Sequence, residues 1–178
     1  MEHPICDKLR REIRQVPDFP KPGINFYDIT TILKNPALFH ETLDVLHSRY
    51  RQLQPDTVVG MEARGFIFGS ALAYLLKCAF VPVRKPGKLP AATERAAYSL
   101  EYGKDALEIH RDALAPGQRV IIIDDLLATG GTAKGTISLC ERLGANVIEC
   151  GFIIELISLE GRARLAPVPV ISLIKFES

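Results

Sequence analysis

The chain has 178 residues, the size of a single domain with room for a buried core, and 47% of its residues are hydrophobic. Its formal net charge of +1 gives no sign of binding to nucleic acid or a membrane surface, so any cationic site must be local. The charged N-terminus (residues 1–14) lacks the apolar core of a secretory signal, and no apolar run approaches the roughly 20 residues that span a bilayer.

Cysteine and histidine usage points to a reducing cytoplasm and gives no metal cluster. The four cysteines, Cys6, Cys78, Cys140 and Cys150, lack metal-ligand spacing, and we expect buried thiols. The four histidines form no cluster and are expected at the surface. We therefore expect one cytoplasmic domain, residues 1–178, with no nucleic-acid or membrane partner.

The N-terminal segment, residues 1–36, is charged and then rich in proline. Residues 8–14 predict a short charged helix, and the prolines at positions 17, 20 and 22 predict an extended segment after it. Composition leaves two interpretations of Phe26 open: a core residue, or an aromatic ring that contacts a ligand.

The next segment has the pattern of a helix, a strand and a second helix. Apolar residues recur at helical spacing over residues 37–52, and residues 57–60 predict a short buried strand. Residues 62–65 form a turn into a helix at 66–76, and such a helix N-terminus suits an anion. Arg64 in this turn suits either an anionic ligand or a surface ion pair, and its place at the strand end favours the ligand.

A basic loop follows the next core strand, residues 80–83. Residues 84–90 hold three cations and three Pro or Gly residues, and the residues up to 97 contain few large apolar side chains. We predict that residues 84–97 form a mobile lid that closes over a substrate, although a solvated loop is the alternative. Residues 98–102 and 106–110 predict the strands of a hairpin joined at Gly103.

The chain is organised around residues 120–136. Residues 120–123 form an unbroken β-branched run, typical of a strand buried on both faces of a parallel sheet. Asp124 and Asp125 follow that run, then the loop Ala-Thr-Gly-Gly-Thr at 128–132, and then a predicted helix at 133–143. Open α/β sheets bind ligands in this kind of loop, at the carboxyl end of a strand.

The chemistry of this loop favours a sugar phosphate. Its glycines allow close backbone approach, its threonines add hydroxyl donors, and the helix N-terminus supplies unpaired N–H groups, so together they suit a phosphate. The acidic pair suits hydroxyl groups or a hard cation such as Mg²⁺. Neither Gly-Lys-Ser/Thr nor Gly-x-Gly-x-x-Gly occurs here, so the loop is neither a Walker P-loop nor a dinucleotide fingerprint.

The C-terminal segment completes an alternation of strands and helices. Gly144 predicts the end of the helix, and residues 146–156 predict another apolar strand. Residues 161–165 indicate a helical or irregular turn, and residues 168–173 a last short strand. This order predicts an α/β fold with a mostly parallel central sheet flanked by helices.

Five motifs now resemble one family. The stretch IIDDLLATGGT at 122–132 is similar to the phosphoribosyl pyrophosphate (PRPP) motif of type I phosphoribosyltransferases, and its wording resembles the adenine-specific branch. Four further stretches resemble that branch in the same order: FPKPGINFYDIT (19–30), EARGFIFG (62–69), RKPGKLP (84–90) and YSLEYG (98–103). The resemblance covers the chain from about residue 8 to the C-terminus.

The resemblance implies a type I phosphoribosyltransferase fold with an N-terminal hood (1–36) and a lid loop (84–97). It implies a purine salvage reaction, in which adenine and PRPP give AMP and pyrophosphate. In that reaction Mg²⁺ is held mainly by PRPP, with Asp124 or Asp125 as its candidate protein ligand. A homodimer is also implied, and the Glu62–Ala63 bond matches a peptide often found cis. The implied catalytic residues are Glu101, Asp124 and Asp125. The implied 5′-phosphate residues are Ala128, Thr129, Gly130, Gly131 and Thr132. The implied pyrophosphate residues are Glu62, Ala63, Arg64, Arg84, Lys85, Lys88 and Tyr102. The implied adenine residues are Asn25, Phe26, Arg64 and Leu156.

Two alternatives stay open from the sequence. One is a phosphoribosyltransferase for another base, and the other is a regulator that binds PRPP or purine without catalysis. The cations of the lid and Glu101 argue against the regulator, because a binding protein needs no apparatus for a leaving group. Tyr27 departs from the family pattern, because it occupies a position that is often basic in the family.

Overall fold

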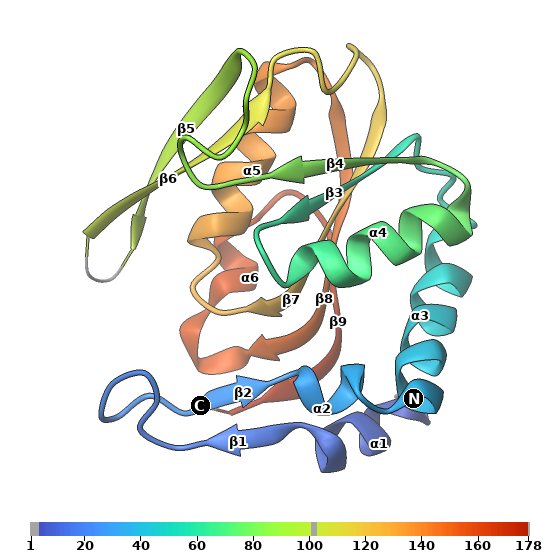
Figure 1. Cartoon of the computed structure of the whole chain (residues 1–178), viewed down its shortest axis with the longest axis vertical. Coiled ribbons are helices and arrows are strands. Elements are labelled where there is room, and N and C mark those ends of the chain that lie inside the picture. Colours follow the sequence, from blue (N-terminus) through green and yellow to red (C-terminus); the bar gives the residue numbers. More distant parts are fainter. Residues whose placement is uncertain (1–3, 101–102, 178) are drawn as a thin grey trace.

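The computed structural model describes residues 4–100 and 103–177. Its centre is a five-stranded parallel sheet in the order β4–β3–β7–β8–β9 (Figure 1). The five strands are β3 (Thr57–Met61), β4 (Ala79–Val83), β7 (Arg119–Leu127), β8 (Asn146–Leu156) and β9 (Val170–Phe176). The mostly parallel α/β sheet predicted from the sequence is confirmed.

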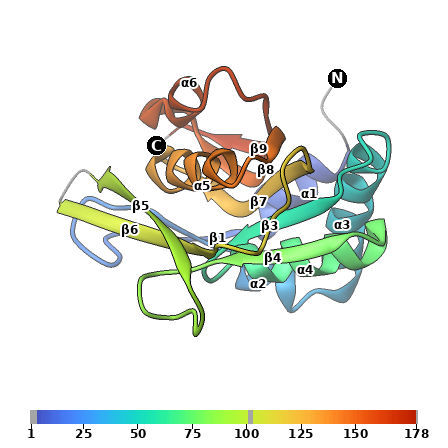
Figure 2. The ribbon, with the colours of Figure 1, turned by 90° about the horizontal axis from the view of Figure 1, so that it is seen from above.

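Helices cover both faces of this sheet. The helices are α1 (Ile5–Glu12), α2 (Thr30–Leu33), α3 (Pro36–Tyr50), α4 (Gly65–Leu76), α5 (Gly131–Arg142) and α6 (Gly161–Arg164), with a 3₁₀ turn η1 at Ile157–Leu159. Figure 2 shows α4 on one side of the sheet and α5 with α6 on the other. One core cluster contains side chains of the four helices α1, α2, α3 and α4 and of β7, for example Ile121. A second cluster contains side chains of α5 and the next residue of β7, Ile122, which points to the opposite face of the sheet. Because β7 is buried on both faces, its apolar run has no polar alternation.

The N-terminal segment folds into a small layer that the sequence predicted only as an extended segment. Strand β1 (Arg14–Val16) pairs antiparallel with β2 (Phe26–Asp28), and Val16 lies opposite Phe26. The charged helix runs over Ile5–Glu12, earlier than predicted, because Ile5 and Leu9 enter the core. Tyr27 is also a core residue, since its ring centroid lies 4.5 Å from that of Phe176 in β9.

The hairpin of β5 (Thr93–Leu100) and β6 (Gly103–His110) projects from the domain, on the left in Figure 1. Strand β5 begins five residues earlier than the sequence predicts, so the segment predicted as the lid, 84–97, is a loop only up to residue 92. Ala96 is buried in the cluster that includes α5, and pairing with β6 makes the rest of this stretch a strand. Small residues with little apolar area gave no such signal in the sequence.

Strand β7 is also longer than predicted, because it includes both Asp124 and Asp125. Hydrogen bonding to β8 continues through this stretch, with Asp124 opposite Phe152 and Leu126 opposite Ile154. The predicted helix at 133–143 begins earlier, at Gly131, and directly follows the short loop 128–130. Among the residues described, no helix has the length and apolar content to cross a membrane.

Candidate active site

The loop between β7 and α5 borders a small cavity at the carboxyl edge of the sheet. The cavity measures about 150 Å³ and is lined by residues 128–133 together with Met61, Asp124, Leu126, Leu127 and Phe152. Gly130 has φ +77°, a left-handed conformation that favours glycine, and α5 begins at the next residue. The first N–H groups of α5 have no partner within the helix, so they and the loop suit a phosphate.

The two carboxylates of β7 have different surroundings. Asp124 lines the cavity beside the loop, and its Oδ1 accepts a hydrogen bond of 2.9 Å from the backbone N–H of Asp125. Asp125 is 2% exposed. Burial and the adjacent Asp125 raise the pKa of Asp124 well above its ordinary value. Burial also raises the pKa of Asp125, although the nearby Arg64 opposes that shift.

Arg64 lies between these carboxylates and the N-terminal segment. Its Nε is 2.9 Å from Oδ2 of Asp125. The two groups form an ion pair, but the direction of the N–H bond does not allow a hydrogen bond. Its guanidinium carbon is 5.2 Å from the centroid of the Phe26 ring, within cation–π distance. The cation therefore contacts residues that the resemblance assigns to two different substrates, Asp125 to the sugar phosphate and Phe26 to the base.

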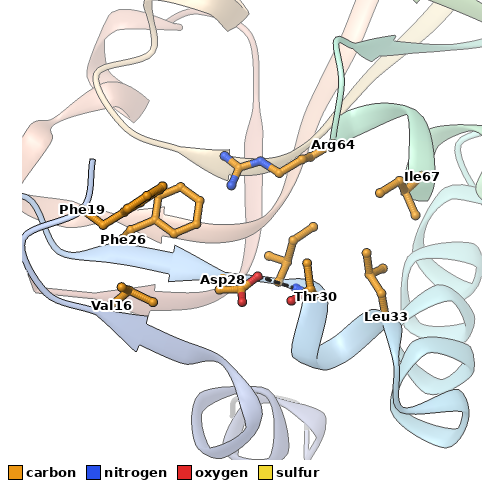
Figure 3. A pocket seen from close by; sticks show the side chains of 9 residues that line it. Val16, Phe19, Phe26, Asp28, Thr30, Leu33, Arg64 and Ile67 are labelled. Carbon is orange, nitrogen blue, oxygen red and sulfur yellow. Dashed lines mark hydrogen bonds between the residues drawn. The ribbon is translucent and has the colours of Figure 1, made fainter. Parts of the chain in front are cut away.

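A second cavity, of about 420 Å³, lies between β1, β2, α2 and the start of α4 (Figure 3). Its walls are mostly apolar, with Phe19 and Phe26 at one side and Leu33 and Ile67 at the other. The two phenylalanine rings meet edge to face, with centroids 5.2 Å apart. Arg64 points toward this space from above in the figure, so the cavity suits a flat aromatic ring.

Asn25 directly precedes Phe26, which lines this cavity, and is itself exposed. Its side-chain amide donates a hydrogen bond of 2.9 Å to Oε1 of Gln15. The side chain of Asn25 is thus engaged within the hood.

The turn from β3 to α4 brings together residues that the sequence assigned to pyrophosphate. The Glu62–Ala63 peptide is cis, as the sequence match suggested. Glu62 accepts hydrogen bonds of 3.2 and 3.1 Å from Nε and Nη2 of Arg84, and one of 3.0 Å from the backbone N–H of Lys85. The bidentate Arg84 contact holds the pKa of Glu62 below its ordinary value. Glu62 therefore orients the start of the basic loop.

The same loop is tied down on its other side. The backbone N–H of Gly87 donates a 3.0 Å hydrogen bond to Oε2 of Glu108 in β6, and Nη1 of Arg84 donates one of 3.1 Å to the carbonyl of Lys88. Lys85 and Lys88 are exposed. Three of the cations predicted to face pyrophosphate, Arg84, Lys85 and Lys88, thus occupy one loop, which is anchored by carboxylates on β6 and on the β3–α4 turn.

Some sequence predictions fall elsewhere. Leu156 is 9% exposed, belongs to the core cluster that includes Tyr27, and lines neither of the two cavities above. Glu101 and Tyr102 lie outside the described residues. Five further residues that the sequence did not predict as site residues line the loop cavity: Met61, Leu126, Leu127, Ala133 and Phe152. Leu126 lies two positions after Asp124 in a strand, and that period could have placed both on one face.

The described residues contain no cluster of three or more His, Cys, Asp or Glu side chains that would hold a metal ion by themselves. Asp124 nevertheless offers a carboxylate inside the loop cavity, whereas the buried Oδ2 of Asp125 is paired with Arg64. Oxygen donors of this kind suit Mg²⁺ when a ligand supplies the remaining oxygens.

Comparison with known proteins agrees with this geometry. The family model described as "Phosphoribosyl transferase domain" matches residues 28–175. The chain is 56% identical to the adenine phosphoribosyltransferase of Synechocystis sp., over 94% of this chain and 99% of the relative. A solved adenine phosphoribosyltransferase from Thermoanaerobacter pseudethanolicus superposes with a TM-score of 0.94 at 50% identity, over 96% of this chain and 99% of that one.

A more distant solved structure carries the same fold. The adenine phosphoribosyltransferase of Saccharomyces cerevisiae, complexed with an imino-altritol bisphosphate and adenine, has a TM-score of 0.91 at 42% identity, over 95% of this chain and 98% of that one. Family model, sequence relatives and structures thus agree over nearly the whole chain. This chain belongs to the adenine phosphoribosyltransferases, which are built on the phosphoribosyl transferase domain.

Proposed function

We propose that this chain transfers the phosphoribosyl group of PRPP to adenine in purine salvage, releasing AMP and pyrophosphate. One observation supports this most directly. Arg64 contacts both Asp125 beside the loop cavity and the ring of Phe26 in the apolar cavity. A sugar phosphate in the first cavity and a base in the second would therefore approach each other at Arg64.

The loop would hold the 5′-phosphate, through the backbone N–H groups of 128–132 and the hydroxyls of Thr129 and Thr132. Asp124 would accept hydrogen bonds from ribose hydroxyls, with Asp125 behind it. Burial raises the pKa of both carboxyl groups and so favours their protonated forms. Positive charge that develops on the ribose ring would act in the opposite direction and favour the ionised pair.

The leaving pyrophosphate would be met by cations. Arg64, Arg84, Lys85 and Lys88 would neutralise its charge, while Glu62 keeps Arg84 in place. Bound Mg²⁺ would supply further neutralisation of the diphosphate oxygens. The candidate protein ligand of Mg²⁺ is Asp124 or Asp125. Ala63 and Tyr102 would be further contacts of the pyrophosphate.

Adenine would stack on Phe26, a contact that contributes about 1–3 kcal/mol per base in nucleic-acid complexes. The backbone of Asn25 would donate its N–H to N1 and accept from the 6-amino group. Leu156 would support the base site from the core side. Glu101 would act on the imidazole proton of the base.

Base specificity tests the proposal. A 6-oxopurine would present the inverse hydrogen-bond pattern to the Asn25 backbone, and each unsatisfied buried group costs about 1–3 kcal/mol. We expect kcat/KM with PRPP and Mg²⁺ to favour adenine over hypoxanthine and guanine by roughly 10²–10⁴. Equal turnover of guanine would indicate a phosphoribosyltransferase for another base, and binding without turnover of any base would indicate a regulator.

We also propose a homodimer in the cytoplasm. Tyr74 on α4 is 83% exposed and Leu75 beside it is 36% exposed, and exposed large side chains are common at protein interfaces. None of the four cysteines, all of which lie in the described part of the chain, forms a disulfide bond, as suits a reducing compartment. Sedimentation equilibrium would detect the dimer, and a single species of 19.7 kDa would contradict it.

A further inference from the structure

The loop proposed to bind the 5′-phosphate, residues 128–132, is here called the phosphate loop. It is in direct contact with the short helix α6. A Cβ atom on Gly161, the first residue of α6, would lie 2.1 Å from the carbonyl oxygen of Ala128 and 3.0 Å from the amide nitrogen of Gly130. A Cβ atom on Gly130 would lie 2.7 Å from the carbonyl oxygen of Gly161. Real Cβ atoms do not approach so closely, so the backbones of the loop and α6 touch because both residues are glycine.

One arginine holds α6 against the sheet. Arg162 donates from Nε to Oε1 of Glu155 at 2.8 Å and from Nη2 to the other oxygen of the same carboxylate. It also donates to the carbonyl of Val170 and, at 3.2 Å, to the hydroxyl of Ser172, so it joins α6 to both β8 and β9. A planar guanidinium with this many partners fixes its helix in position and orientation.

Glu155, the carboxylate that accepts the hydrogen bonds of Arg162, lies next to the start of the phosphate loop. Glu155 is 5% exposed and lies opposite Leu127, the last residue of β7 before the loop begins. The Arg162 hydrogen bonds keep the pKa of Glu155 below its ordinary value, so it is ionised at neutral pH. A second link comes from Arg164, whose Nη1 lies 3.3 Å from the carbonyl of Thr129.

We infer that Arg162 and Glu155 are positioning residues for the phosphate loop, acting through the backbone contact of Gly161 with Ala128 and Gly130. Neither side chain lines the loop cavity, so neither is expected to touch the substrate. The inference rests on the proposed function, because it assumes that the loop binds the 5′-phosphate. The ion pair keeps α6 seated, and α6 keeps the loop N–H groups aimed at the phosphate.

The chain offers a matched control on the same strand. Arg49 of α3 makes a bidentate pair with Glu149 of β8, which is 3% exposed, and this pair lies far from the loop at the other end of β8. Loss of either pair leaves a buried carboxylate without its cation, so both losses should destabilise the fold. Only loss of the Arg162–Glu155 pair should disturb the loop.

The test compares two probes, ribose 5-phosphate and pyrophosphate, titrated by calorimetry into wild type, Arg162→Gln and Arg49→Gln. A misplaced contact of about 1 Å can cost about 10²-fold, so we expect Arg162→Gln to bind ribose 5-phosphate roughly 10- to 100-fold more weakly. We expect its affinity for pyrophosphate to stay within about 2-fold, because the charged turn and the basic loop are untouched. Arg49→Gln should lower Tm while keeping both affinities.

Two further variants keep the test decisive if Arg162→Gln does not fold. Arg162→Lys keeps the charge but loses the bidentate geometry, and should show an intermediate loss of ribose 5-phosphate affinity. Gly161→Ala keeps the ion pair but pushes on Ala128, and should show the same selective loss. In steady-state assays these variants should raise the KM for PRPP more than they lower kcat.

Three outcomes would overturn the inference. The first is normal affinity for ribose 5-phosphate in folded Arg162→Gln, and the second is normal affinity for the same probe in Gly161→Ala. The third is that Arg162→Gln and Arg49→Gln each lose affinity for both probes to the same extent. Failure of wild type to bind ribose 5-phosphate would instead remove the proposed function.

Discussion

Two turns at the same edge of the sheet offer different kinds of groups to a ligand. The turn after β3 (62–64) uses side chains, since Glu62 orients Arg84 and Arg64 reaches Asp125 and Phe26. The loop after β7 (128–130) uses backbone, with Gly130 in a left-handed conformation and Gly161 packed against it. Sensitivity to mutation should differ accordingly: the first turn depends on the charges it carries, and the second depends on what supports it.

The largest effect is expected from the carboxylates that lie between the two turns. Asp124→Asn with Asp125→Asn keeps size but removes both charges, including the partner of Arg64. Removing one transition-state contact costs about 10²–10³ in rate, and we expect at least that loss in kcat for the pair. Circular dichroism should show an intact fold. Near-normal turnover by the double variant would contradict the catalytic assignment of both residues.

A pair of single variants tests the comparison of the turns directly. Arg64→Gln removes a charged contact, and hydrogen bonds to charged groups contribute about 1.5–3 kcal/mol, so kcat/KM should fall about 10- to 100-fold. Thr129→Ala removes only a hydroxyl from a loop that acts through backbone, and should cost less than about 10-fold. The reverse order of the two losses, measured in one assay, would contradict the division into side-chain and backbone turns.

The basic loop should show a difference between bound and free protein. Residues 85–91 are mostly exposed, although Glu62 and Glu108 anchor backbone N–H groups in this stretch. Limited proteolysis should therefore cut between residues 85 and 97 more slowly once PRPP and Mg²⁺ are added. Cleavage at the same rate in both conditions would mean that this segment is only a solvated loop.

The smallest expected effect is a loss of thermal stability in acid, caused by the Arg162–Glu155 pair that supports the loop after β7. Because Arg162 lowers the folded-state pKa of Glu155, the pair stabilises the fold above the ordinary glutamate pKa of about 4.3. That stabilisation is lost as pH falls through the lower folded-state value. The Tm of wild type should thus drop more between neutral pH and about pH 3 than the Tm of Glu155→Gln. Parallel curves for the two proteins would show that the pair adds no acid-sensitive stability.

The sequence by itself determined the parallel sheet and the position of the phosphate loop. The run Val120, Ile121, Ile122, Ile123 predicts a doubly buried strand because burial on both faces leaves no polar alternation. The loop 128–132 was found because glycines before a helix are a local feature of the chain. Signals of this kind depend on neighbours in sequence, so they need no knowledge of distant partners.

Only the tertiary structure decided which distant groups meet. Strand β5 begins at Thr93 because of pairing with β6, and β7 continues through its two aspartates because of pairing with β8. The contact of Arg64 with Phe26 joins segments that are 38 positions apart, and Gly161 reaches Ala128 across 33. Such contacts depend on how whole layers pack, and no local pattern of residue types encodes the distance between two elements.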